Sequence, residues 1–289
     1  MQKLSGGVFG SALLIAAAQA LVAMAEGDLR SMEIAPVTEG HWYRPAVGVS
    51  WQWQLLVDDE HPLNTTYAVD VYNLDLFETS SATIKALQGS GHRVICYFSA
   101  GTYENYSQDR QQFAREVLGN EVAGWPEERW LDIRSPSVER IMTEPLDMAA
   151  RKGCDAVEPD NVQGYLEDTG FDFSAQDQLA YNRFIANQAH RRGLAVGLKN
   201  DLEQISELVD YFDFTINEQC FQYHECEQLM PFIAAGKPVL NVEYPRGGQK
   251  ATPNAESVAD LCIAANELGF STLILPLELD GRFRVSCQR

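Results

Sequence analysis

From residue 47 onward, short runs rich in β-branched and aromatic residues alternate with longer stretches of helical periodicity. This alternation is typical of repeated βα units, which build a parallel sheet covered by helices. The predicted strands are 47–55, 68–77, 93–100, 130–134, 155–160, 195–200, 214–219, 238–244 and 272–277. A (β/α)8 TIM-like barrel with one additional strand is the predicted fold. No GxGxxG turn follows the first strand, which disfavours a doubly wound open sheet.

Segments with helical periodicity fill the intervals between the predicted strands. They cover 81–88, 108–118, 137–151, 175–192, 202–209, 225–235 and 254–268. Several of them run into a glycine, where a left-handed C-cap is expected. These glycines are Gly153, Gly193, Gly236 and Gly269.

Residues 1–25 have the features of a secretory signal peptide. Lys3 supplies a basic start, residues 8–24 form an apolar run, and Ala23-Met24-Ala25 fits a cleavage site with small residues. The run is shorter than the roughly 20 apolar residues of a membrane span, so cleavage is favoured over anchoring. The sequence therefore predicts a secreted, extracellular protein in which residues 26–289 form one catalytic domain, without membrane association after cleavage.

The net charge of −19 constrains the partners of this chain. An acidic surface repels nucleic acids and anionic membranes and attracts a cationic substrate, although many secreted proteins are acidic for solubility alone. We expect a monomer.

Six cysteines in an exported chain indicate disulfides. Cys220 with Cys226 and Cys262 with Cys287 are the natural pairs. Cys96 and Cys154 lie in apolar runs and could form a third bridge or remain buried thiols. The sequons at Asn64 and Asn105 are compatible with glycosylation.

Polar residues end nearly every predicted strand. In a (β/α) barrel the active site lies at the carboxyl ends of the strands, so these residues are the candidates for function. Any one of them could be a helix cap, but the set holds more carboxylates than capping requires. The candidates are Asp75, Tyr97, Ser99, Asp132, Glu158, Asp160, Asn161, Lys199, Asn200, Asp201, Glu218, Glu243 and Tyr244.

Two of these carboxylates suit glycoside hydrolysis, which needs one carboxyl group on each side of the scissile bond. Asp160 and Glu218 end two strands that are separated by a single strand. Lys199, on that intervening strand, could keep a neighbouring carboxylate ionised or form a plain salt bridge. The histidines are scattered and no CxxC pair occurs, so we expect no metal and no cofactor, and a metal-dependent deacetylase is disfavoured.

Five segments in one order resemble a known family. VICYFSAG (94–101), WLDIR (130–134), GCDAVEPDN (153–161), VGLKND (196–201) and NEQC (217–220) resemble glycoside hydrolase family 114, the endo-α-1,4-polygalactosaminidases. The resemblance extends from about residue 51 to 287. It implies a (β/α) barrel, an endo-acting hydrolase of α-1,4-linked galactosamine in partly deacetylated galactosaminogalactan, and catalysis by Asp160 and Glu218. Where the family often reads YDIDLFD, this chain reads YNLDLFE, with Asn73 and Glu78 in place of the first and last Asp. These departures leave the catalytic pair intact but bear on which sugars the subsites prefer.

The free amines of such a polymer are cations, and Asp75, Asp132, Glu158 and Asp201 are expected to pair with them. The proposed mechanism retains configuration, with Asp160 as nucleophile and Glu218 as acid and base. Carboxyl groups about 5 to 5.5 Å apart indicate retention, and about 6.5 to 9.5 Å inversion. Two alternatives stay open: a hydrolase of another α-linked hexosamine or galactose polymer, and a secreted carbohydrate-binding barrel without catalysis.

Overall fold

The computed structural model describes residues 35–107, 109–245 and 252–288. The predicted signal peptide, residues 1–25, lies outside this range. The chain from Val37 onward forms one compact unit. None of the helices in the described part is long and apolar enough to cross a membrane.

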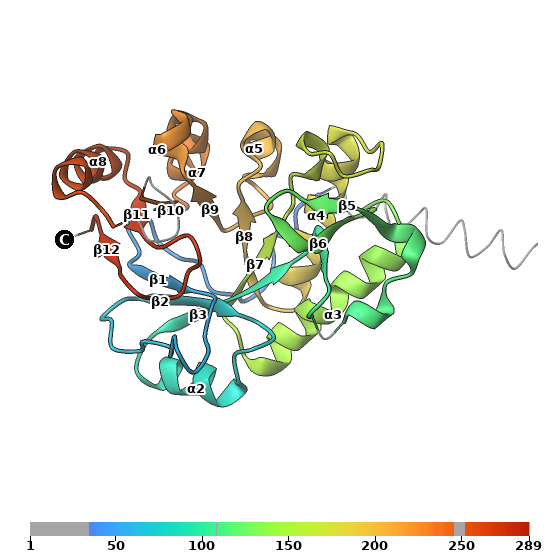
Figure 1. Cartoon of the computed structure of the whole chain (residues 1–289), viewed down its shortest axis with the longest axis horizontal. Coiled ribbons are helices and arrows are strands. Elements are labelled where there is room, and N and C mark those ends of the chain that lie inside the picture. Colours follow the sequence, from blue (N-terminus) through green and yellow to red (C-terminus); the bar gives the residue numbers. More distant parts are fainter. Residues whose placement is uncertain (1–34, 108, 246–251, 289) are drawn as a thin grey trace, which may run out of the picture. The chain divides into compact units, whose positions relative to one another are not determined.

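The main sheet contains eight parallel strands and one short antiparallel strand (Figure 1). The parallel strands follow one another in chain order, as a barrel requires, so the predicted fold class is confirmed. They are β1 (Trp51–Gln54), β2 (Val71–Asp75), β3 (Arg93–Ser99), β7 (Ala156–Asp160), β8 (Ala195–Lys199), β9 (Phe214–Glu218), β10 (Val239–Glu243) and β11 (Ser271–Ile274). Strand β12 (Val285–Ser286) pairs antiparallel with β11.

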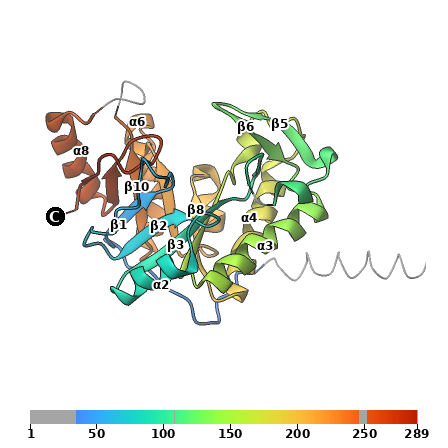
Figure 2. The ribbon, with the colours of Figure 1, turned by 60° about the horizontal axis from the view of Figure 1, so that its bottom comes forward.

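Helices connect most of these strands and pack on the outside of the sheet (Figure 2). They are α2 (Ser81–Gly89), α3 (Pro136–Lys152), α4 (Ala175–Arg191), α5 (Ile205–Leu208), α6 (Cys220–Tyr223), α7 (Met230–Ala234) and α8 (Ala255–Glu267). Short 3-10 turns lie at Gly164–Leu166, Leu202–Gln204 and Cys226–Leu229. The four predicted C-cap glycines all have positive φ, between 72° and 88°.

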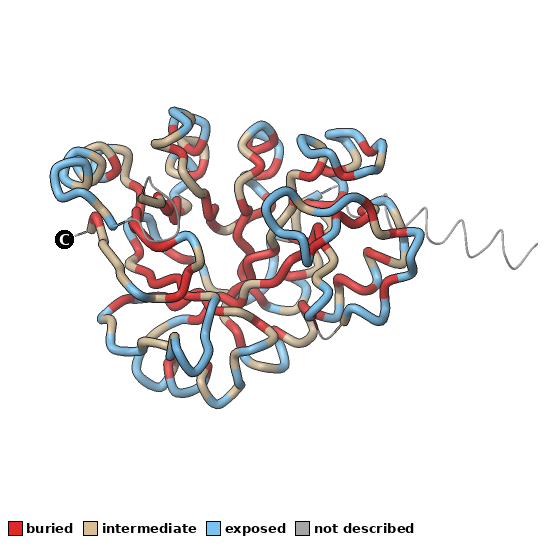
Figure 3. Tube along the Cα trace, in the orientation of Figure 1, coloured by how far each residue is buried: buried red, intermediate tan, exposed pale blue. Residues whose placement is uncertain are grey.

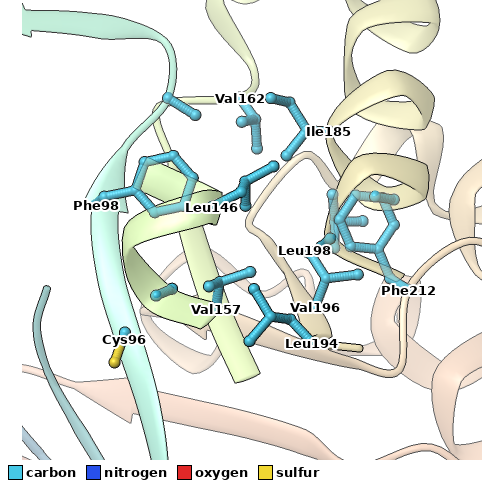
Figure 4. Packing of buried hydrophobic residues seen from close by; sticks show 14 of the residues in the cluster. Cys96, Phe98, Leu146, Val157, Val162, Ile185, Leu194, Val196, Leu198 and Phe212 are labelled. Atoms are coloured by element: carbon cyan, nitrogen blue, oxygen red, sulfur yellow. The ribbon is translucent and has the colours of Figure 1, made fainter. Parts of the chain in front are cut away.

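The strands are largely buried (Figure 3), and the side chains that alternate along them belong to two hydrophobic clusters. One cluster holds residues from all eight parallel strands and fills the interior of the curled sheet; Ala156 of β7 belongs to it. The next residue, Val157, belongs to a larger cluster between the strands and the helices, which Figure 4 shows with Leu146 of α3 and Ile185 of α4. Glu158 and Asp160 therefore point to the interior side, as the alternation predicts.

Side-chain bonds connect the first and last parallel strands. The indole nitrogen of Trp51 donates to the carbonyl of Ser271 (2.8 Å), and Arg284 near β12 donates to the carbonyl of Trp51 (2.7 Å). Gln288 donates to the carbonyl of Gly48 (2.7 Å). These bonds draw β1 and β11 together, so the sheet curls around its interior cluster.

The predicted barrel strand 130–134 is wrong. Residues Trp125–Leu131 form β6, the central strand of a separate antiparallel sheet with β4 (Thr102–Glu104) and β5 (Leu118–Val122). The missed signal is Ala123-Gly124, a two-residue hairpin turn with Gly124 at φ 86°. Helix 108–118 is also wrong in its described part, which holds 3-10 turns at Arg110–Gln112 and Arg115–Val117.

Three disulfides staple the fold. Cys220–Cys226 and Cys262–Cys287 form as predicted. The open question of the remaining two cysteines is answered by a third bridge, Cys96–Cys154, which ties β3 to the residues that precede β7. This bridge spans 58 positions of the chain, the longest of the three separations.

The loop lengths predict a ranking of stability losses. Closure of a longer loop removes more entropy from the unfolded chain, so Cys96→Ala/Cys154→Ala should lower the free energy of unfolding by about 4 kcal/mol, against about 2 kcal/mol for Cys220→Ala/Cys226→Ala. Denaturant unfolding of both variants measures the difference. Equal losses, or a larger loss for the short loop, would contradict this ranking.

Candidate active site

One lysine joins two carboxylates at the carboxyl ends of three adjacent strands. Lys199 ends β8, and its Nζ lies 2.9 Å from Oδ2 of Asp160 on β7 and 3.3 Å from Oε2 of Glu218 on β9. These two oxygens can therefore be no farther apart than the sum of the two distances. Asp160 and Glu218 thus flank the Lys199 ammonium, and the space between the two carboxyl groups is the gap.

Lys199 is a buried cation with several stabilising contacts. Its side chain is 2% exposed, and Nζ also lies 3.4 Å from Oε1 of Glu158. The faces of Trp53 and Tyr97 lie 5.0 and 5.9 Å from it. Burial opposes the charge, but Asp160, Glu218 and Glu158 together raise the pKa of Lys199 above its ordinary value, so it remains an ammonium.

Glu218 is oriented by two further side chains. The hydroxyl of Tyr244 donates to Oε1 at 2.5 Å, and the amide of Asn200 donates to Oε2 at 3.3 Å. The backbone N–H of Glu218 donates in turn to Oδ1 of Asn200 (3.0 Å). Burial and the neighbouring Glu218 raise the pKa of Tyr244 well above its usual range, so this phenol stays a donor.

Asp160 is fixed from the opposite side. Its Oδ1 accepts the backbone N–H of Asn161 at 2.7 Å, and the Asn161 amide donates to Ser99 (2.9 Å) and Thr102 (3.2 Å). A Cβ added at Gly101 would lie 1.7 Å from the carbonyl oxygen of Asn161, so only glycine permits this close approach.

The residues that directly follow these three strands adopt an uncommon backbone conformation. Asn161, Asn200 and Gln219, which follow β7, β8 and β9, have φ values of 61°, 50° and 66°. The left-handed region is strained for residues other than glycine, and Asn tolerates it best. Each turn directs the chain sharply away from its strand, which leaves the last strand side chain at the mouth.

Exposure separates the residues that can reach a substrate from those that cannot. The side chains of Asp160 and Glu218 are 16% and 27% exposed, whereas that of Glu158 is 0% exposed. Glu158 lies beneath the pair with Asn73, whose amide donates to Oε2 at 2.5 Å. Glu158, which is predicted to contact substrate, therefore has no exposed surface in this structure.

Other predicted residues are held by contacts of their own. Asp201 is buried and accepts the Asn182 amide (2.8 Å), and Glu243 is buried and accepts the backbone N–H of Phe221 (3.0 Å). Asp132 follows β6 and forms an ion pair with Arg134 (2.8 Å) instead of ending a barrel strand. Asp75 ends β2 and accepts the backbone N–H of Glu78 (2.7 Å).

The antiparallel sheet contributes acidic residues that sequence reasoning missed. Glu104 of β4 and Glu128 of β6 both accept from the hydroxyl of Tyr106, at 3.2 and 3.5 Å. Glu128 also accepts from Thr102 (2.9 Å), which links it to Asn161 and the Asp160 turn. Burial and the charge of Glu128 raise the pKa of Glu104 to about 8, and burial raises that of Glu128. Neither glutamate lies at the carboxyl end of a predicted strand, so the strand-end pattern does not point to them.

The part of the chain that the structure describes has no group of three or more His, Cys, Asp or Glu side chains placed to hold a metal ion. The gap is lined by two partly exposed carboxylates, the ammonium between them and the hydroxyl and amide donors around them.

A (β/α) barrel with two carboxylates at one mouth defines a class of protein, the barrel glycoside hydrolases. The sequence model of Glycoside-hydrolase family GH114 matches residues 32–289, so the chain belongs to this family, and the resemblance seen in the sequence is confirmed.

Two solved structures place the chain among known proteins. Aspergillus fumigatus Ega3 in complex with galactosamine is 40% identical, with a TM-score of 0.80, over 86% of this chain and 99% of that one. The glycoside hydrolase domain of PelA from Pseudomonas aeruginosa is 16% identical, with a TM-score of 0.61, over 82% and 98%. The second likeness concerns the fold alone. The comparison with curated protein sequences returned no match.

The buried carboxyl groups predict that the protein loses stability as the pH rises. Burial raises the pKa of Glu158 and Glu104 to about 8 and that of Asp201 to about 7. Between the ordinary carboxyl range and these values the folded state binds more protons than the unfolded state, so the free energy of unfolding falls with increasing pH. Urea midpoints should decline from pH 5 to pH 8.

Asp201→Asn tests how much Asp201 contributes to this loss of stability with rising pH. The amide can still accept from Asn182 but does not ionise, so the decline between pH 5 and pH 7 should be shallower than in the wild type. A wild-type midpoint that rises over this interval would contradict the assignment.

Proposed function

We propose that this protein is a secreted, endo-acting glycoside hydrolase that cleaves α-1,4-linked galactosamine in partly deacetylated galactosaminogalactan, with Asp160 and Glu218 as its catalytic pair. The observation that carries the proposal is the partly exposed pair held across one gap by Lys199. The 40% identity to Ega3, whose structure contains galactosamine, supports the choice of sugar. Three disulfides and the predicted signal peptide support secretion.

The short bridge through Lys199 supports retention of configuration. The summed distances from Nζ to the two oxygens are below the about 6.5 Å at which inverting pairs begin, which favours retention over direct attack by water. Asp160 attacks the anomeric carbon while Glu218 gives its proton to the leaving oxygen. Glu218 then removes a proton from water, which displaces Asp160 and restores both carboxyl groups.

The groups around each carboxyl indicate which one is the nucleophile and which one is the acid and base. Lys199 is closer to Asp160 than to Glu218, so its ammonium pairs most closely with the carboxylate that attacks. Glu218 is more exposed and has Tyr244 and Asn200 to hold its orientation, as an acid that must also accept a proton requires. Asp160 is accordingly the nucleophile and Glu218 the acid and base.

The acidic pair of the inserted sheet favours a cationic substrate. Glu104 is partly buried, Glu128 is buried, and the Tyr106 hydroxyl bridges them, so their ionised forms repel each other. An ammonium group of galactosamine beside them would relieve this repulsion, whereas an acetylated nitrogen would not. We therefore place recognition of the free amine on this side of the gap.

Removal of either catalytic carboxyl should abolish turnover. Asp160→Asn and Glu218→Gln are expected to lower kcat about 10²- to 10⁴-fold on deacetylated galactosaminogalactan. Asp260→Asn, on the exposed surface of α8, is the matched control and should keep wild-type activity. Reducing ends measured over time give the rates. A full-activity Asp160→Asn variant would overturn the assignment.

Mass spectrometry of the products identifies the substrate. Galactosamine oligomers from the deacetylated polymer, and none from the fully acetylated one, are the expected result. Release of oligomers only from a different α-linked polymer would favour a hydrolase of another hexosamine or galactose polymer. Binding of the polymer without any product would favour a carbohydrate-binding barrel.

Glu104→Gln tests amine recognition separately from the chemistry. The amide cannot ionise when an ammonium group binds, so KM for the deacetylated polymer should rise several-fold and depend less on salt, while kcat should change little. An unchanged KM and an unchanged salt dependence would show that Glu104 does not recognise the free amine.

A further inference from the structure

The group beneath the catalytic pair is a third carboxyl that the reaction scheme above does not use. Glu158 is 0% exposed, and its two oxygens have unequal surroundings. Oε2 accepts the amide of Asn73 on β2, whereas Oε1 is buried without a hydrogen-bond partner and has only Nζ of Lys199 at 3.4 Å. An ionised carboxylate without water normally requires several donors, and this one has a single amide and a cation that it shares with two other carboxylates, so ionisation of Glu158 is opposed.

The charges in this cluster lead to the same conclusion. One ammonium is shared by three carboxyl groups, and it is closest to Asp160. If all three ionised, one cation would face three anions in a buried space, which is strongly unfavourable. Burial raises the pKa of Glu158 to about 8, with Asp160 and Glu218 adding to the rise and Lys199 opposing it.

We propose that Glu158 is a positioning residue that stays protonated in the resting enzyme, so that the charge of Lys199 serves the catalytic pair instead of a third anion. This inference rests on the proposed function of Asp160 and Glu218. Asn73 contributes to this role because its side chain is an amide. With an amide as its neighbour, Glu158 faces no second carboxyl group from β2.

The groups around Glu158 come from four other strands, from its own strand and from the residue that follows β10. They are Asn73, Tyr97, Asp160, Lys199, Glu218 and Tyr244. Lys199 is the single cation among them, and the pKa values of Tyr97 and Tyr244 are raised well above their usual range. Below about pH 8, an uncharged Glu158 therefore leaves Lys199 balanced against the catalytic pair alone.

Substitutions at positions 73 and 158 separate this role from simple packing. Glu158→Gln keeps the shape and the neutral state, so both limbs of the pH profile of kcat/KM should stay within about 0.3 units of the wild type. Asn73→Asp sets a second carboxyl against Glu158; two such groups share one proton and carry a negative charge, which should shift both limbs upward by about one pH unit. The double variant Asn73→Asp/Glu158→Gln restores one acid and one amide, and its limbs should return toward the wild-type positions.

Two results would overturn the inference. Limbs that move downward in Glu158→Gln would show that Glu158 is ionised in the resting enzyme. Limbs that stay in place in a folded Asn73→Asp variant would show that this pair does not act on the catalytic carboxyls. Thermal unfolding of each variant verifies that it is folded.

An infrared difference spectrum tests the protonation state without any turnover. At pH 6, wild type minus Glu158→Gln should show the C=O band of a protonated carboxylic acid. Absence of this band rejects a protonated Glu158. If the band is present but the wild type cleaves no galactosamine polymer, the proposed function fails while the buried proton stands, so the two failures are distinguishable.

Discussion

The ammonium of Lys199 is the interaction on which the site depends. It lies at the end of β8, between the strands that carry Asp160 and Glu218, and above the buried Glu158. Without a cation there, three acidic side chains would face one another in a space with little water. Their mutual repulsion would destabilise the strand ends that hold them. With it, two carboxyl groups remain a short distance apart at the surface, and the third is held below as a neutral acid.

The scaffold supports this cation through ordinary barrel geometry. Parallel register places the last residues of β7, β8 and β9 at one edge, and left-handed residues after each strand turn the chain away at once. Gly101 allows Asn161 to approach β3 closely, so that Asn161 can bond to Ser99 and Thr102. The same contacts connect the barrel mouth to the inserted antiparallel sheet, which adds Glu104 and Glu128 to one side.

The sequence predicted the features that follow from periodicity and strand ends. Eight of nine proposed strands lie in the barrel, and Asp160, Lys199 and Glu218 come together as their strand positions required. The antiparallel sheet was missed because Trp130 and Ile133 read as part of an apolar strand, while the Ala123-Gly124 turn was overlooked. Burial was also not predictable: Glu158 and Asp160 lie on the same face of β7, and only the depth of the barrel distinguishes a buried acid from an exposed one.

The claim that Lys199 holds the two carboxyl groups at a separation suited to retention can be tested by following the first product. Proton NMR during hydrolysis of deacetylated galactosaminogalactan shows the anomeric form of each new reducing end before mutarotation. The account predicts that the α-anomer appears first. Initial formation of the β-anomer would mean that water attacks directly, and it would contradict the geometry assigned to the pair.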